Sequence, residues 1–175
     1  MKNYYLLIFG LVILSCYPKP KLNIIYDDFD GSTIFSLDNN ILISEDITHE
    51  IELNIQKTIT GNNSTYLIIL ECVGSTKIGI TDSTKTTFLI DNSKRTFIPN
   101  SVVLNKNIDP ELILEVGNYI TDFDFIKKLA YGYEVKIKLE GNRKIIYSQL
   151  SLDNKINLQN FIESFISLEE QTNSD

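Results

Sequence analysis

Long stretches of the chain alternate apolar and polar residues, which is the pattern of a β-strand that buries one face. The run from Tyr66 to Val73 is apolar on both faces except at Glu71, as in a central strand. Gly61 to Ser64 has the composition of a turn. We therefore predict a hairpin in which this turn joins the run from Ile47 to Ile59 to the central strand. The apolar face of the first strand would consist of Ile47, Ile51, Leu53, Ile55 and Ile59.

Two more hairpins are predicted where turn residues separate alternating runs. One has its turn at Asp91 to Lys94, and the other has its turn at Gly141 and Asn142. The strands that these turns would join are 86–90 with 95–98, and 133–140 with 143–150.

Helical spacing of apolar residues is confined to two segments near the end of the chain. Thr121 and Asp124 resemble a capping box, and the apolar face that follows them ends near Gly132. A second helix is predicted from Asn157 to Leu168, after a turn at Ser151 to Ile156. The apolar faces of the two helices would be Phe125, Ile126, Leu129 and Ala130, and Leu158, Phe161, Ile162, Phe165 and Ile166.

These elements predict an α+β fold made mainly of antiparallel sheet, with about eight strands and with two helices in the C-terminal half. A β-sandwich with peripheral helices is the alternative. No linker or long repeat interrupts the pattern, so we expect a single globular domain over 22–168, followed by a polar, acidic tail over 169–175.

The N-terminus has a different composition from the rest of the chain. Lys2 precedes an apolar run from Tyr4 to Leu14, which has the length of a secretory signal and is too short to span a bilayer. The sequence Ile13-Leu14-Ser15-Cys16 that follows resembles the lipobox of bacterial lipoproteins. The resemblance implies a signal peptide over 1–15, and a lipid on Cys16, with diacylglycerol on its sulfur and palmitate among its acyl groups.

Residues 16–21 would then be the lipidated cysteine and a short tether, which is extended at its two prolines. Two acyl chains are enough for stable attachment to a membrane. We therefore expect a protein of the cell envelope that is held close to its membrane by the lipid. The outer membrane or the cell surface is expected rather than the cytoplasmic membrane.

Charge and the reactive side chains narrow the classes of function. The formal net charge is -7, which argues against binding to nucleic acid. His49 is the single histidine, and we expect it as a hydrogen-bonded residue at the border of the buried face. Once Cys16 carries a lipid, Cys72 is the remaining cysteine, and it lies in phase with buried positions. We therefore predict an inert thiol, no catalytic residue and no cofactor.

The sequence Asp27-Asp28-Phe29-Asp30-Gly31 is the strongest candidate for chemistry. It resembles the opening of concanavalin-like jelly-roll domains, many of which bind or cleave saccharides, and Asp27, Asp28 and Asp30 are the candidate ligands for Ca²⁺. The simpler interpretation is a turn whose aspartates bond their own backbone and hold no metal.

The sequence thus favours a lipid-anchored envelope protein that binds a partner or has a structural role without catalysis. The expected partners are the membrane, through the lipid, and an envelope protein or surface ligand. The alternative is an exported hydrolase, or a β-sandwich that binds saccharide or calcium, with the Asp27 to Asp30 turn as its site.

Overall fold

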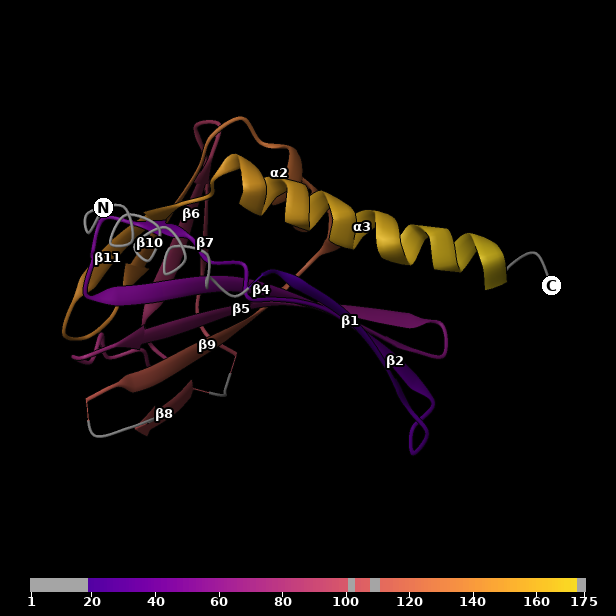
Figure 1. Ribbon diagram of the computed structural model, residues 1–175, viewed down its shortest axis with the longest axis horizontal. Coiled ribbons are helices and arrows are strands. Elements are labelled where there is room, and N and C mark those ends of the chain that lie inside the picture. Colours follow the sequence, from indigo (N-terminus) through magenta and orange to yellow (C-terminus); the bar gives the residue numbers. More distant parts are fainter. Residues whose placement is uncertain (1–18, 101–102, 108–110, 173–175) are drawn as a thin grey trace, which may run out of the picture.

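The computed structural model describes residues 19–100, 103–107 and 111–172, and this part of the chain forms two antiparallel sheets and two helices (Figure 1). The predicted class, α+β with mainly antiparallel sheet and helices in the C-terminal half, is confirmed. The sequence Ile13 to Cys16 lies outside the described residues, as do 173–175.

The larger sheet, sheet A, has six strands in the order β1-β2-β4-β5-β9-β8. Its centre is the predicted hairpin, in which Leu53 lies opposite Leu70 and Ile55 lies opposite Ile68, and all four side chains are buried. The strands are β1 (Lys21–Asp27), β2 (Ser32–Asp38), β4 (His49–Thr60), β5 (Asn63–Gly74), β8 (Val103–Asn107) and β9 (Ile113–Thr121).

The smaller sheet, sheet B, has five strands in the order β3-β11-β10-β6-β7 and contains the other two predicted hairpins. Its strands are β3 (Ile43–Ser44), β6 (Lys85–Ile90), β7 (Ser93–Phe97), β10 (Val135–Glu140) and β11 (Ile145–Gln149). The described residues thus contain more strands than the eight or so that we predicted. Edge strands account for part of the excess, because β1 is largely exposed on both faces and β3 is only two residues long.

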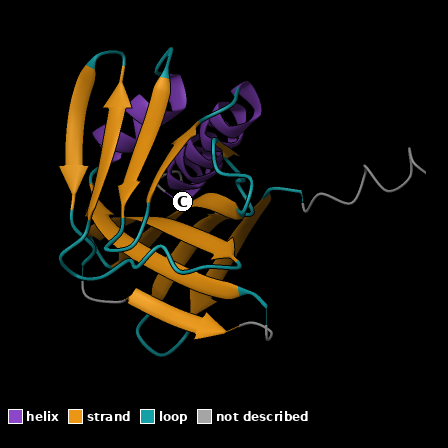
Figure 2. Cartoon of the chain, turned by 90° about the vertical axis from the view of Figure 1, so that its left-hand side faces the viewer, coloured by secondary structure: helices purple, strands orange, loops and turns teal. Residues whose placement is uncertain are grey.

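The strands of the two sheets run in clearly different directions, and both helices pack beside them (Figure 2). One core joins all four components, so that Phe88 of sheet B, Leu53 of sheet A and Phe125 and Phe165 of the helices belong to a single buried cluster. The helices are α2 (Phe123–Tyr131) and α3 (Leu152–Thr172).

Several predicted boundaries were wrong. Ile47 is 98% exposed and precedes β4, so it is not part of the buried face. The cap of α2 is Asp122 and not Thr121, because the Asp122 carboxylate accepts a hydrogen bond from the Phe125 amide. The predicted turn at Ser151 is the start of α3.

A reciprocal cap explains why α3 begins five residues before the predicted start. The Asn154 amide donates to the Ser151 hydroxyl, and the Ser151 amide donates to the Asn154 side chain, at 3.1 and 2.9 Å. This arrangement satisfies amides that a helix start leaves unpaired. The helix then continues to Thr172, so the segment predicted as a tail from 169 contributes to its last turn.

Candidate functional site

The outward face of sheet B presents a regular grid of side chains. Lys136 of β10 lies between Gln149 of β11 and Leu89 of β6, and Lys94 of β7 extends the same row. A second row consists of Tyr147, Lys138, Thr87 and Thr96. Alternation along β10 explains the arrangement, since Val135, Ile137 and Leu139 point into the core and the intervening lysines point out.

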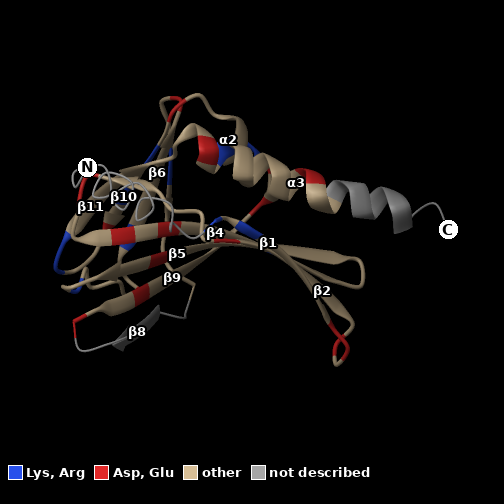
Figure 3. Cartoon of the chain, viewed as in Figure 1, with Lys and Arg blue, Asp and Glu red and all other residues tan. Residues whose placement is uncertain are grey.

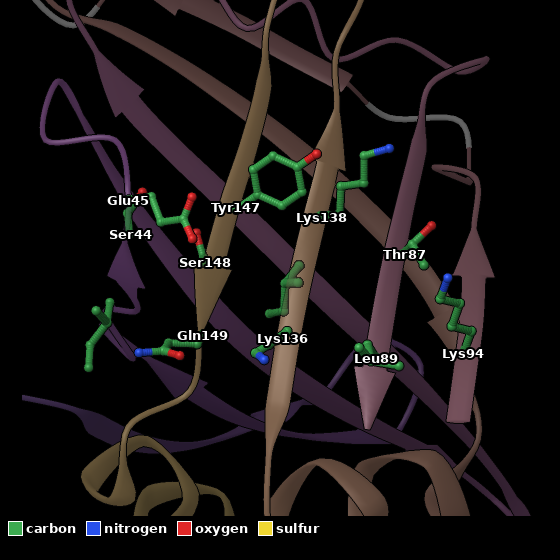
Figure 4. A pocket seen from close by; sticks show the side chains of 12 residues that line it. Ser44, Glu45, Thr87, Leu89, Lys94, Lys136, Lys138, Tyr147, Ser148 and Gln149 are labelled. Carbon is green, nitrogen blue, oxygen red and sulfur yellow. The ribbon is translucent and has the colours of Figure 1, made fainter. Parts of the chain in front are cut away.

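This face is hollowed, with a cavity volume of about 360 Å³ (Figure 4). We call it the sheet B groove, and define it by Ile43, Ser44, Glu45, Thr87, Leu89, Lys94, Lys136, Ile137, Lys138, Tyr147, Ser148 and Gln149. Its size lies at the lower end of the range for small-ligand sites. Leu89 and Ile43 supply apolar surface, and the tyrosine ring and the lysine stems can add to it.

Two of the three lysines of the groove form ion pairs with neighbouring glutamates. Lys136 pairs with Glu134 at 2.8 Å, and Lys138 pairs with Glu140 at 2.6 Å. The bond to Glu140 raises the pKa of Lys138 above its usual value. Both pairs are partly exposed to solvent, so exchanging a glutamate for another anion costs little. The third lysine, Lys94, comes from the edge strand β7.

The outward face of sheet A carries carboxylates instead: Glu50, Glu52 and Glu71 alternate with buried residues of β4 and β5, and the acidic positions of these strands are red in Figure 3. Burial raises the pKa of Glu71, a bond from Asn54 opposes this shift, and the charges of Glu52 and Asp38 add to it. Burial also raises the pKa of Glu50, again with the help of Glu52. The two sheet faces therefore offer different surfaces to a partner, and the lysines of the sheet B groove line a hollow that also has apolar side chains.

A second, more open hollow lies between the turn at Asp91 and helix α2. The Asp91 carboxylate accepts hydrogen bonds from the amides of Tyr133 and Glu134, at 3.1 and 2.8 Å, and these bonds lower its pKa. Asp91 therefore stabilises the segment that leads into β10, and its carboxylate is occupied by hydrogen bonds from the backbone of that segment.

The Asp27 to Asp30 turn lies at the tip of the β1–β2 hairpin, far from the sheet B groove (Figure 1). The Asp27 carboxylate accepts from the Phe29 amide, and the Asp30 carboxylate accepts from the Ser32 amide, each at 2.9 Å. The bonds from Ser32 lower the pKa of Asp30. Asp28 is exposed in the same turn. This geometry is that of aspartates that bond their own backbone, as in the simpler interpretation.

His49 is buried where the two sheets meet, and both of its ring nitrogens face oxygen atoms. Nε2 lies 2.7 Å from the Thr76 carbonyl, and Nδ1 lies 3.0 Å from the Asp46 carboxylate. The Thr76 carbonyl can only accept, so it takes its hydrogen bond from Nε2–H, and Nδ1 also lies 2.9 Å from the Thr48 hydroxyl. Lys144 of the β10–β11 turn also pairs with Asp46. The expected hydrogen-bonded histidine is present, but it is more deeply buried than a border position.

Glu115 of β9 is a second buried ionisable side chain near the junction of the sheets, and sequence reasoning missed it. Its carboxylate accepts from the amides of Ile78, Gly79 and Ile80, in the loop between β5 and β6. The Ile78 carbonyl in turn accepts from the backbone amides of Arg143 and Lys144 in the β10–β11 turn. We call this set the junction cluster: Asp46, His49, Thr76, Ile78, Gly79, Ile80, Glu115, Arg143 and Lys144.

Cys72 is buried and lies opposite Glu115 in the sheet, as its phase in the sequence predicted. Burial raises the pKa of the Cys72 thiol far above its usual range, and the charge of Glu115 adds to the shift. A thiol in these surroundings is a poor nucleophile.

The groove could have been found from one signal in the sequence. Lys136 and Lys138 alternate along their strand with the apolar residues Val135, Ile137 and Leu139, which places two amines on one exposed face. Lys94 and Ile43 line the groove because of the order in which β7 and β3 join sheet B beside β6 and β11. No local pattern in the sequence predicts that order.

Comparison with known proteins gave no match: no family model, no curated protein and no solved structure matches the chain. Within the described ranges 19–100, 103–107 and 111–172, no group of three His, Cys, Asp or Glu side chains is placed to hold a metal ion. In the same ranges, no helix is long and apolar enough to cross a membrane.

Proposed function

We propose that the chain is a lipid-anchored protein of the bacterial cell envelope whose globular part is a non-catalytic binding module. The anchor would be the lipid on Cys16. The sheet B groove would be the binding surface, and its partner would be an envelope protein or a surface ligand that presents apolar groups beside negative charge.

One observation carries the binding proposal: the groove gathers three lysines around apolar side chains, in a chain whose net charge is -7. A negatively charged partner is repelled by the chain as a whole and is attracted only where amines are concentrated. The glutamates beside Lys136 and Lys138 keep these amines ordered in the absence of a partner. Because these pairs are exposed, exchanging them for the anion of a partner costs little.

Amine reactivity in cells tests the binding surface. We would treat cells that carry the full chain, and the purified full chain, with a small amine-acetylating reagent and compare the extent of modification by mass spectrometry. Lys94, Lys136 and Lys138 should be protected in cells, whereas Lys127, which is similarly exposed on α2, should react equally in both samples. Equal modification of the groove lysines in both samples would contradict the proposed surface.

Fractionation tests the anchor separately. The full chain should partition with membranes and into detergent, and a Cys16→Ser variant should be released by a high-salt wash. The argument is that the apolar run at the N-terminus is too short to span a bilayer, so the lipid alone would hold the protein. A Cys16→Ser variant that stays with the membrane would show that the lipid is not the anchor.

A further inference from the structure

Strand β1 forms one edge of sheet A and exposes an apolar sequence. Leu22, Ile24 and Tyr26 share the face on which Phe35 and Leu37 of β2 are buried, yet Ile24 is 57% exposed and Tyr26 is 64% exposed. The β1–β2 hairpin projects from the body of the molecule (Figure 1). A long apolar edge strand is a template for pairing with another strand, and proteins commonly block such edges with charge or proline.

The backbone of β1 is oriented for such pairing. The Asp27 carbonyl accepts from the Gly31 amide within the turn, so the backbone groups of Asp27 face β2. In an antiparallel sheet the backbone groups of successive residues point to opposite sides. Those of Leu22, Ile24 and Tyr26 therefore face the free edge.

We propose that β1 pairs with β1 of a second copy of this chain, antiparallel, about a twofold axis at Ile24. The sequence of the strand is self-complementary in this register. Lys21 of each copy lies opposite Asp27 of the other, Leu22 lies opposite Tyr26, and Ile24 lies opposite itself. The two six-stranded sheets become one continuous sheet, with about six new backbone hydrogen bonds.

The charges at the two ends of β1 select the second copy as the partner and fix the register. A Lys–Asp pair forms at each end of the paired strands, and opposite charges facing each other across a strand pair are favourable. In a register shifted by two residues toward the N-terminus, Pro20 would lie opposite Tyr26, and proline has no N–H to donate. A shift in the other direction places Asn23 opposite Asp27 and leaves Lys21 outside the paired segment.

The interface is small by comparison with the roughly 1,600 Å² of a typical stable complex, so we expect a weak dimer that forms at high local concentration. Cysteine cross-linking detects such a dimer in cells. In the Ile24→Cys variant of the full chain, the two cysteines would lie on the axis with Cα atoms about 5.5 Å apart, within reach of a disulfide. Mild oxidation of the cells should produce a covalent dimer on a non-reducing gel.

The matched control is Ile25→Cys, because Ile25 is 55% exposed and is one position away. In the proposed register its two copies are about 8 Å apart, which is beyond the reach of a disulfide without movement of the backbone. Cross-linking of Ile24→Cys without Ile25→Cys supports the proposal. Equal yields from both variants indicate random collision and overturn it, as does the absence of cross-linking at Ile24→Cys.

Charge substitutions test the register independently. When Lys21→Glu is combined with Ile24→Cys, the yield of covalent dimer should fall severalfold. The substitution places a negative charge opposite Asp27 of the second copy, and the two like charges repel each other. Lys19→Glu should leave the yield unchanged. The reverse result would place Lys19 opposite Asp27 and overturn the proposed register.

Discussion

The junction cluster and the sheet B groove both concentrate charged side chains, but they use them in different ways. In the junction cluster, Glu115 is buried and its carboxylate accepts three backbone hydrogen bonds. In the groove, Lys136 and Lys138 form ion pairs with glutamates that are partly exposed to solvent. A buried charge is expensive to leave without its partners, whereas an exposed pair contributes little. Charge therefore serves stability at the junction, whereas in the groove it stays accessible for the recognition that we propose.

Position in the fold explains this difference. The loop between β5 and β6 carries the chain from sheet A to sheet B, and its amides at Ile78 to Ile80 have no strand partner there. Glu115 supplies the missing acceptor. The loop also lies close to the β10–β11 turn, where a Cβ atom on Gly141 would come within 2.2 Å of the Ile78 carbonyl oxygen. The junction cluster thus joins the two sheets through hydrogen bonds of the backbone.

The largest effect is expected from Glu115→Ala. Removing the carboxylate leaves the three amides of the loop without an acceptor in a buried position, and we expect a loss of about 4 kcal/mol in the free energy of unfolding. Urea unfolding followed by far-UV circular dichroism measures this loss. The control is Glu134→Ala on the surface, which should cost less than about 0.5 kcal/mol. Similar losses for the two variants would contradict the contrast between junction and groove.

A smaller loss is expected from His49→Ala, which removes both hydrogen bonds of the ring and leaves the Thr76 carbonyl unpaired. We expect about 2–3 kcal/mol. Gly74→Ala should also destabilise the protein, because its Cβ would come within 2.3 Å of the His49 ring.

The two substitutions at His49 and Gly74 should be strongly non-additive. Once the ring is absent, the new methyl group has room, so the double variant should be no less stable than His49→Ala alone. Additive losses in urea unfolding would show that the ring does not occupy the space beside Gly74.

The acid sensitivity of the junction should depend on Asp46. Burial acts against its charged form, but bonds from Lys144 and Thr48 outweigh burial and hold the pKa of Asp46 well below its usual value near 3.8. A carboxylate with a depressed pKa stabilises the folded state above its unfolded pKa, and this contribution is lost as the pH falls. Asp46→Asn should therefore be less stable than the parent chain at pH 7, and the difference should begin to shrink below about pH 4 and continue to shrink as the pH falls toward the lowered pKa of Asp46. A constant difference across this range would contradict the assignment.

The sequence predicted the parts of the fold that depend on local patterns. The alternation in β4 and β5 and the turn at Gly61 gave a hairpin that is paired over its full length. Long-range contacts could not be obtained in this way. Lys57 lies in the apolar phase of β4 and is buried with its Nζ 4.0 Å above the Phe165 ring, which belongs to α3. Likewise, the burial of Glu115 depends on amides from a loop more than thirty residues away in sequence.

The smallest effect, and one of opposite sign, is expected on the outward face of sheet A. The pKa of Glu71 is raised by burial and, despite a bond from Asn54, by the charges of Glu52 and Asp38. A carboxylate whose pKa is higher in the folded than in the unfolded chain opposes folding at a pH where it is charged in both. This cost disappears at a lower pH, where the carboxylate is protonated in the folded and in the unfolded chain. Glu71→Gln retains an oxygen that can accept from Asn54, so the substitution should stabilise the protein at pH 7, by no more than about 0.5 kcal/mol.

Urea midpoints at pH 7 and near pH 4 measure the effect of Glu71→Gln, with Glu134→Gln, at the residue that precedes β10, as the matched variant beside sheet B. Glu134 lies beside Lys136 in an exposed ion pair, so its replacement should lower stability slightly where the Glu71 replacement raises it. The gain from Glu71→Gln should shrink as the pH falls toward 4, because protonation removes the same repulsion in the parent chain. If Glu71→Gln instead lowered stability at pH 7, the charged Glu71 would be stabilised by its contacts, as Glu115 is. The contrast between the junction cluster and the outward faces would then not hold for sheet A.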